Sequence, residues 1–139
     1  MKDEHEQQLI KKYPSLFMDY AKDPTESLMY FGCECGSGWY ELLDRTCAKL
    51  VEQAKLENID VSFSQVKEKF GALRIYLSNG SDALWKILSD AEHESESICE
   101  WCGAPGSLDV LNRWHATLCP SCKEKRREQQ KIRFADIHK

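Results

Sequence analysis

Four cysteines near the C-terminal end constrain this chain of 139 residues more than any other feature. They form two CxxC pairs, Cys99 with Cys102 and Cys119 with Cys122, separated by the stretch 103–118. A CxxC turn directs two thiolates at one ion, and two such turns complete the tetrahedral geometry of structural zinc. The spacing therefore predicts one Zn²⁺ ion held by these four cysteines.

The number of thiolate ligands also predicts the role of the ion. Four thiolates fill the coordination shell of zinc and leave no position for a reactive water, so we expect a structural ion and not a catalytic one. Metal binding of this type contributes on the order of 10 kcal/mol to the folding of segments that are too small to be stable alone.

The residues around the cysteines indicate a treble-clef arrangement. Gly103 directly follows the second cysteine, as in a zinc knuckle, where a glycine lets backbone amides turn toward the sulfur atoms. Residues 108–118 are long enough for a short β-hairpin. Pro120 suits the first turn of the helix that we expect over 123–131.

The preceding residues predict helices and one β-hairpin. Apolar residues at spacings of three and four predict a helix over 38–56, with Ser37 or Gly38 as its N-cap and Trp39 in the core. Alternating apolar residues predict a β-hairpin over 60–78. The remaining predicted features are a helix over 3–12, a turn with positive φ at Gly71, and a helix over 81–97 capped by Ser81.

These elements predict an α+β fold with a helix and β-hairpin core and a C-terminal treble-clef-like zinc module. We expect the body to span residues 1–98 and the zinc module to span residues 99–139. Almost no spacer separates them, so the module is expected to pack against the body.

Composition sets limits on location and partners. The hydrophobic content of 42% supports a packed core, and the polar segment Met1–His5 does not have the character of a secretion signal. We therefore expect a cytoplasmic protein that does not bind a membrane.

The charged residues are divided unevenly along the chain. Residues 1–98 carry 11 basic and 18 acidic residues, a net charge of −7, whereas residues 99–139 carry 8 basic and 5 acidic residues, a net charge of +3. Broad nucleic-acid binding is disfavoured by this balance, although a local basic segment can contact phosphate.

Three further cysteines, Cys33, Cys35 and Cys47, are expected to be reduced thiols in the cytoplasm. Cys47 belongs to the apolar stripe of the predicted helix, so packing is the favoured interpretation. A second metal site is the alternative, since CxC is a known ligand spacing.

Cations and aromatic residues alternate around the predicted hairpin. The candidate binding surface consists of Lys67, Lys69, Phe70, Arg74 and Tyr76. Such a mixture can hold phosphate or stacked bases. The alternative, which we favour slightly, is a solvated strand face whose lysines protect the edge of the sheet.

Two tryptophans and one histidine of the zinc segment have candidate roles. Trp101 and Trp114 are expected to cover the zinc site, and the alternative is that one of them anchors a partner. His115 lies in about the region where a treble-clef nuclease carries a water-activating histidine. A lone histidine supports that interpretation weakly.

Four motifs spread over most of the chain carry a family resemblance: Gly38–Leu43 with Cys47, Gln65–Tyr76 (QVKEKFGALRIY), the CxxCGxxG motif Cys99–Gly106, and Thr117–Cys119. On these motifs the chain resembles a family of small, uncharacterised bacterial and bacteriophage proteins. Members of this family are often found in phage and prophage genomes, so the resemblance implies a bacteriophage origin. The family has no established activity, so the resemblance implies no specific chemistry.

The segment Cys99–Lys123 is locally similar to the zinc finger of the DksA/TraR group. Those proteins enter the secondary channel of RNA polymerase with a long coiled-coil hairpin. Here a β-hairpin is predicted in the central region, so the similarity implies the fold of the finger and not the activity.

Together these observations predict a zinc-stabilised, non-enzymatic binding protein that docks on a host macromolecule, as a defence inhibitor or a transcription modulator. A host protein is the expected partner. The alternatives are a DNA- or RNA-binding zinc-finger protein and an HNH-like nuclease that uses His115.

Overall fold

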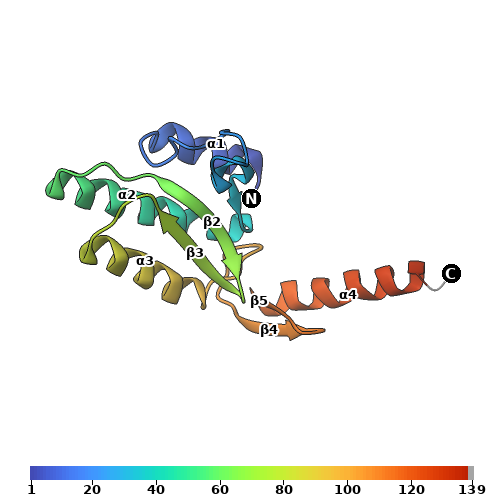
Figure 1. The fold of residues 1–139 in the computed structure, drawn as a ribbon. Helices are drawn as coiled ribbons and strands as arrows, with labels where there is room; N and C mark the ends of the chain where they lie inside the picture. The colour runs from blue at the N-terminus through green and yellow to red at the C-terminus, as the bar shows by residue number, and fades with distance from the viewer. Residues whose placement is uncertain (138–139) are drawn as a thin grey trace.

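The computed structural model, which describes residues 1–137, contains a three-stranded sheet covered by helices, a smaller two-stranded sheet and a long final helix (Figure 1). In the larger sheet, β1 (Cys33–Glu34) runs parallel to β2 (Phe63–Lys69), which is antiparallel to β3 (Ala72–Leu77). The smaller sheet pairs β4 (Ser107–Leu111) with β5 (Trp114–Leu118). The predicted α+β class is confirmed.

The helices agree with the predicted positions within a few residues, except at the C-terminal end of the last helix. They are α1 (Asp3–Lys12), α2 (Tyr40–Glu57), α3 (Asp82–Ser95) and α4 (Pro120–Ile137), with two 3₁₀ turns, η1 (Leu28–Phe31) and η2 (Ser37–Trp39). The predicted cap of α3 is confirmed, because the Ser81 hydroxyl accepts the amide of Leu84 at 3.3 Å. This bond satisfies one of the amides that the first helical turn leaves without a partner.

The predicted N-cap of α2 is wrong. The helix begins at Tyr40, after η2, and its N-cap residue Trp39 makes no side-chain capping bond. The Ser37 hydroxyl instead accepts a hydrogen bond from the backbone amide of Lys2 at 2.8 Å. This bond fixes the N-terminus of the chain against the turn. At its other end α2 terminates at Asn58, which adopts the left-handed conformation with φ 54°.

The predicted β-hairpin is present, but its strands are shorter than the range 60–78. Its turn has positive φ at two consecutive residues, Phe70 (53°) and Gly71 (84°), as type I′ turns require. The positive φ expected at Gly71 is confirmed, whereas that of Phe70 is unusual for a bulky residue. The Glu68 carboxylate supports the turn by accepting the amide of Gly71 at 2.7 Å.

The main core lies between the larger sheet and the helices, where α3 packs against both α2 and β3. Trp39 is fully buried there, as predicted. The largest fully buried side chains of this core are Leu9, Leu16, Met29, Trp39, Leu42, Leu43, Leu50, Phe63, Val66, Leu73 and Leu84. Among residues 1–137, no helix combines the length and apolar character needed to cross a lipid bilayer.

Helix α4 is longer than the predicted 123–131 and extends away from the body (Figure 1). Its first residue is Pro120, as expected from the sequence. A buried carboxylate anchors it to the smaller sheet: Asp109 in β4 accepts hydrogen bonds from Arg126 at 3.1 Å and from Arg127 at 2.9 Å. The Arg127 guanidinium is the main reason why the pKa of Asp109 is lowered.

Candidate metal centre

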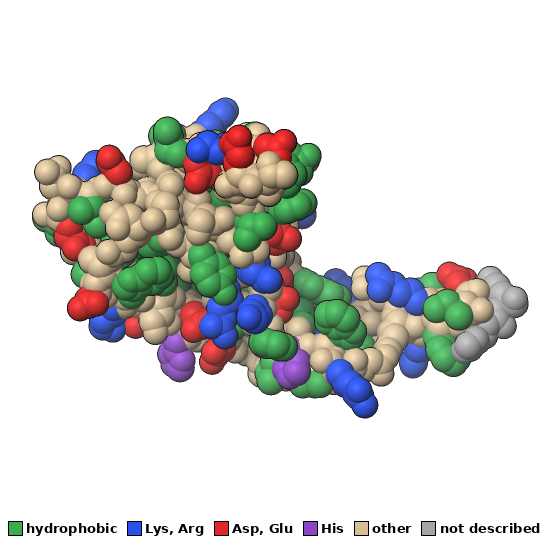
Figure 2. All heavy atoms as spheres, in the orientation of Figure 1, with side chains coloured by type: hydrophobic (Ala, Val, Ile, Leu, Met, Phe, Trp, Pro, Cys, Tyr) green, Lys and Arg blue, Asp and Glu red, His purple; other side chains and the backbone are tan. Residues whose placement is uncertain are grey.

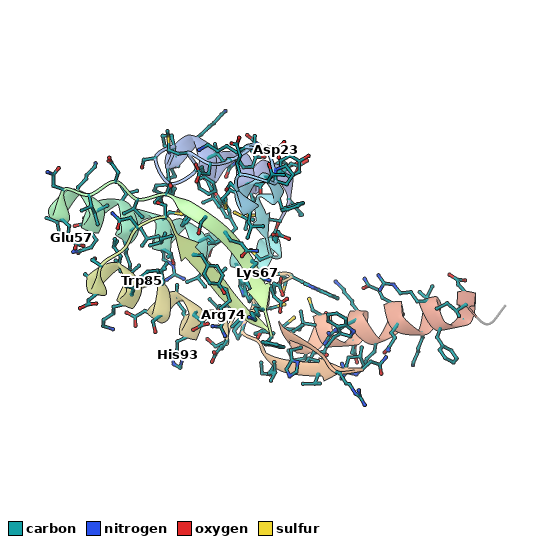
Figure 3. The ribbon with its side chains drawn as sticks, viewed as in Figure 1. Asp23, Glu57, Lys67, Arg74, Trp85 and His93 are labelled. Atoms are coloured by element: carbon teal, nitrogen blue, oxygen red, sulfur yellow. The ribbon has the colours of Figure 1, made fainter. Side chains whose placement is uncertain are left out.

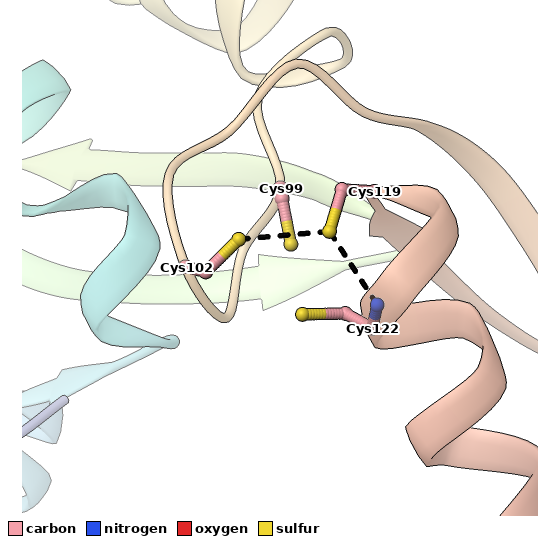
Figure 4. A group of neighbouring side chains, drawn as sticks. All are labelled: Cys99, Cys102, Cys119 and Cys122. Carbon is pink, nitrogen blue, oxygen red and sulfur yellow. Dashed lines mark hydrogen bonds between the residues drawn. The ribbon is translucent and has the colours of Figure 1, made fainter.

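The structure brings the four predicted ligands together. The sulfur atoms of Cys99, Cys102, Cys119 and Cys122 all lie within 4.8 Å of one another (Figure 4). The Cys102 and Cys119 sulfurs are 3.6 Å apart. Tetrahedral zinc with Zn–S bonds of about 2.3 Å separates its sulfurs by about 3.8 Å, so the cluster can hold one metal ion and its size is consistent with zinc.

Local backbone geometry directs these sulfurs inward. The first pair lies on a knuckle in which the Gly103 amide donates to the Cys99 carbonyl at 2.9 Å, and Gly103 has φ 83°. The second pair spans the start of α4, where the Cys122 amide donates to the Cys119 sulfur at 3.4 Å. Knuckle, hairpin and helix therefore follow the predicted treble-clef order.

The two cysteines of the second pair differ in acidity. The Cys122 amide lowers the pKa of the Cys119 thiol to about 7, whereas burial raises the pKa of the Cys122 thiol to about 12. The thiolate is the form that binds metal. Metal binding at this cluster therefore releases protons, and its affinity falls as the pH is lowered.

Glu100, inside the knuckle, joins the metal centre to the body. Its carbonyl accepts the Gly38 amide at 2.7 Å, and its carboxylate accepts the Gly36 amide at 2.9 Å. Its own amide donates to the Thr117 carbonyl of β5 at 2.9 Å. Because the side chain is largely buried, its pKa is raised. The expected packing of the zinc module against the body is thus confirmed.

The loop that meets the knuckle has no room for side chains at two positions. A Cβ atom at Gly38 would clash with the backbone carbonyl oxygens of Cys99 and Glu100, and a Cβ atom at Gly36 would clash with that of Glu100. Next to this contact, the indole N–H of Trp39 donates to the Ile98 carbonyl at 2.9 Å. The glycine-rich loop is therefore an integral part of the metal centre.

A second contact joins the two hairpins. The Thr117 hydroxyl of β5 donates to the Gly71 carbonyl at the tip of the β2–β3 hairpin, at 2.6 Å. Both the hydroxyl and its partner are buried. Consequently the β2–β3 tip has a fixed position relative to β4 and β5.

The candidate binding residues divide into two groups. Lys67 lies directly opposite Arg74 on the hairpin, and both are marked in Figure 3. The Arg74 guanidinium is 2.6 Å from the Glu92 carboxylate of α3, so this cation already has a partner. Tyr76 borders a separate groove together with Trp85 of α3. Lysine and arginine side chains gather over the end of the hairpin that meets the zinc module (Figure 2).

Lys69 and Phe70 instead border a cleft of about 490 Å³ between the two hairpin tips. Residues 68–70 line one side and residues 112–115 line the other. Trp114 lies here, with 75% of its surface exposed. It was expected to cover the four cysteines, but it lies at the end of β5 opposite to Cys119. The His115 ring contacts the Phe70 ring edge-on, with centroids 5.8 Å apart. We name this feature the tip cleft.

The other three cysteines are free and buried. Burial raises the pKa of the Cys33 thiol to about 12 and also raises the pKa values of Cys35 and Cys47. Within the part of the chain that the structure describes, they do not belong to a group of three or more ligating side chains close enough to share an ion.

Comparisons of the chain with protein families, with curated proteins and with solved structures found no match.

Proposed function

We propose that this chain is a zinc-stabilised, non-enzymatic binding protein that acts by docking on a macromolecule of a bacterial host. The resemblance to small bacteriophage proteins supports a phage origin and action in the host cytoplasm, as a defence inhibitor or a transcription modulator. The observation that carries the proposal is the cluster of four cysteines, whose sulfurs lie within 4.8 Å of one another. Four thiolates would leave zinc no position for substrate or water.

In this proposal the ion stabilises a surface and does no chemistry. The knuckle bonds to the glycine-rich loop through Glu100, and β5 holds the β2–β3 tip through Thr117. Zinc binding would therefore set the relative positions of loops from both halves of the chain. Loops positioned by a rigid scaffold are common sites of binding.

A second candidate, direct binding of nucleic acid, is favoured by one specific observation. The tip cleft combines exposed aromatic rings with the cations Lys69 and Arg113. Protein and nucleic acid are thus the two classes of partner that the experiments must separate.

The proposal is tested first by metal analysis of freshly purified protein. We expect one zinc per chain, and the cobalt-substituted protein should have the absorption spectrum of tetrahedral coordination by four sulfurs. Absence of a tightly bound divalent metal, or fewer than four sulfur donors, would contradict the proposal.

The zinc-loaded protein is then incubated with DNA, RNA and nucleoside triphosphates, and products are separated by chromatography. We expect no turnover. Cleavage that is lost in His115→Ala, while the zinc content is unchanged, would show instead that the protein is a nuclease.

A further inference from the structure

We propose that the tip cleft binds unpaired bases of single-stranded nucleic acid, with its cations contacting the adjacent phosphates. This inference rests on the proposed function of a binding protein and specifies the class of its partner. It concerns residues 68–70 and 112–115, which the fold brings together from the body and from the zinc module.

The first observation is the display of aromatic rings. Phe70 is 67% exposed and Trp114 is 75% exposed, although aromatic side chains of this size are normally buried. They border the same cleft from two different hairpins. Exposed aromatic faces beside a basic groove are the platforms on which successive bases stack in single-stranded complexes, each stack contributing about 1–3 kcal/mol.

The second observation is that the backbone of both tips and the ring of Phe70 are held in place. Phe70, Asn112 and Arg113 all have positive φ, at 53°, 49° and 70°. Two consecutive residues with positive φ are what a tight type I′ turn requires, so both tips are short turns with a defined backbone conformation. The hydrogen bond from Thr117 to Gly71 fixes one tip, and the Phe70 ring rests against His115. A ring that is already ordered loses little conformational entropy when it binds.

The third observation is the local charge. Lys69 lies 5.8 Å from the centre of the Phe70 ring, and Arg113 borders the cleft from the other tip. Among residues 1–137, Glu68 is the one acidic residue that lines the cleft, and its carboxylate accepts the Gly71 amide. Lys67 lies two residues before Lys69, on the same face of β2. The cleft is therefore cationic although the body as a whole is acidic.

The size of the cleft and its combination of aromatic rings with cations favour a nucleic acid over a protein partner. A volume of about 490 Å³ lies within the range of about 300–1,000 Å³ that is typical of pockets for small ligands, and a nucleobase is such a ligand. The centres of protein interfaces are depleted of lysine, whereas Lys69 borders this cleft. Asn112 adds an amide that can both donate to and accept from the edge of a base. Bases within a duplex have no free faces, so the strand must be single.

Binding is measured on the zinc-loaded full chain with fluorescein-labelled oligothymidylate and oligouridylate of about ten nucleotides. Fluorescence anisotropy gives the dissociation constant at several salt concentrations, and tryptophan emission reports stacking. We expect saturable binding that weakens with salt and quenches tryptophan emission. The two oligonucleotides distinguish a DNA strand from an RNA strand as the source of the bases.

Matched variants locate the binding site. Trp114→Leu should weaken binding by about 5- to 150-fold, the equivalent of one base stack. The control Trp85→Leu removes an exposed tryptophan from α3, outside the cleft, and should leave the affinity unchanged. Lys69→Gln should lower the slope of log affinity against log salt by about 0.7, the value for one phosphate contact, whereas Lys49→Gln on α2 should not.

The outcomes separate this inference from the proposed function. No saturable binding below about 1 mM, or equal weakening by Trp114→Leu and Trp85→Leu, would overturn the nucleic-acid inference. If a host protein binds through the cleft instead, capture of that protein is lost in Trp114→Leu while neither oligonucleotide binds, and only the inference fails. Metal-free protein, or cleavage of the oligonucleotides, would contradict the proposed function. Zinc content and circular dichroism of each variant confirm that it is folded.

Discussion

Gly38 shows how a single position without a side chain connects the metal centre to the rest of the chain. Its amide donates to the Glu100 carbonyl at 2.7 Å, a distance that requires the two backbones to be in direct contact. A methyl group at this position would overlap the carbonyl oxygens of Cys99 and Glu100. These are backbone atoms of the knuckle, and they cannot move without moving Cys99.

Gly38→Ala is therefore expected to destabilise the protein by about 1–3 kcal/mol, the usual cost of overpacking, and to weaken zinc binding. Denaturant unfolding and competition with a chelator measure the two effects. Gly80→Ala is the matched control, because the atoms nearest to its methyl group all belong to the half-exposed ring of Trp85, which can move aside, and not to backbone. Equal stability of the two variants would show that the loop does not need close contact with the knuckle.

Residues of the metal centre differed in how well the sequence predicted them. The four cysteines were predicted because metal-ligand chemistry leaves a local spacing that is visible without a structure. Glu100 was not predicted, since its partner Gly36 is 64 positions away and a glutamate in a knuckle has no distinctive pattern. Lys69 and Phe70, which line the tip cleft, belong to the predicted binding surface, and that surface stays a prediction. Asn112 and Arg113 approach them only because two separate hairpins contact each other, which leaves no local signal in the sequence.

Among the elements, the two hairpins are joined by one buried hydroxyl. Thr117→Val removes the donor to the Gly71 carbonyl while keeping the shape of the side chain. We expect a loss of about 1–3 kcal/mol of unfolding free energy, because a buried carbonyl is left without its partner. Chemical denaturation measures this loss.

Thr46→Val is the matched control for this prediction. Thr46 is equally buried, but its hydroxyl donates to Leu42 within α2, one turn earlier in the same helix. That carbonyl keeps its backbone hydrogen bond, so the cost should be smaller. If the two variants lose the same stability, the contact between the hairpins contributes nothing specific.

The anchoring of α4 gives a prediction about pH. Arg127 and Arg126 hold the pKa of Asp109 below its usual value of 3.8. The stabilisation by Asp109 is therefore fully present above about pH 4 and is lost as the pH falls through the lower, folded-state pKa. Asp109→Asn should reduce the unfolding free energy at pH 7 by about 1–3 kcal/mol.

Unfolding of both proteins at pH 7, 6 and 5 tests the sign of this linkage. The difference between wild type and Asp109→Asn should stay constant over this range, because Asp109 remains ionised in both the folded and the unfolded chain. Loss of a metal ion from the cysteine cluster in acid would affect both proteins equally, and its effect would cancel in the difference. A difference that already shrinks between pH 7 and 5 would contradict a lowered pKa for Asp109.

Elements with a clear period were predicted well, and short or irregular ones were not. The apolar stripe of α2 and the alternation in β2 and β3 extend over several residues and indicate their structure directly. β1 has only two residues, and its pairing of Cys33 with Val66 is a tertiary contact with no local signal. Helix α4 continues beyond its predicted end at residue 131. The residues of this distal part are compatible with a helix, but they carry no apolar pattern from which the helix could have been predicted.

For the whole molecule, the position of the metal centre predicts what its removal does. A chelator should unfold the knuckle and thereby free the amides of Gly36 and Gly38, which donate to Glu100. Hydrogen–deuterium exchange should become fast in the segment 31–39 and in β5, whereas the buried turn of α2 around Leu50 should stay protected by the main core.

Addition of zinc after chelation is the control, and it should restore the slow exchange of these segments. Unchanged exchange at Gly36 and Gly38 in the metal-free protein would mean that the loop is ordered by the body alone. In that case the ion would stabilise only the C-terminal segment, and the tip cleft would keep its shape without metal.

Three of the four cysteines lie beneath other atoms, but Cys102 is exposed. Peroxide, alkylating agents and competing metals would therefore react with the Cys102 sulfur before the other three sulfurs, and damage to the cysteine cluster would begin there. Since the same turn carries Glu100, whose bonds reach the loop at Gly36 and Gly38, a lesion at one surface thiol would be transmitted to a segment more than sixty positions earlier in the chain.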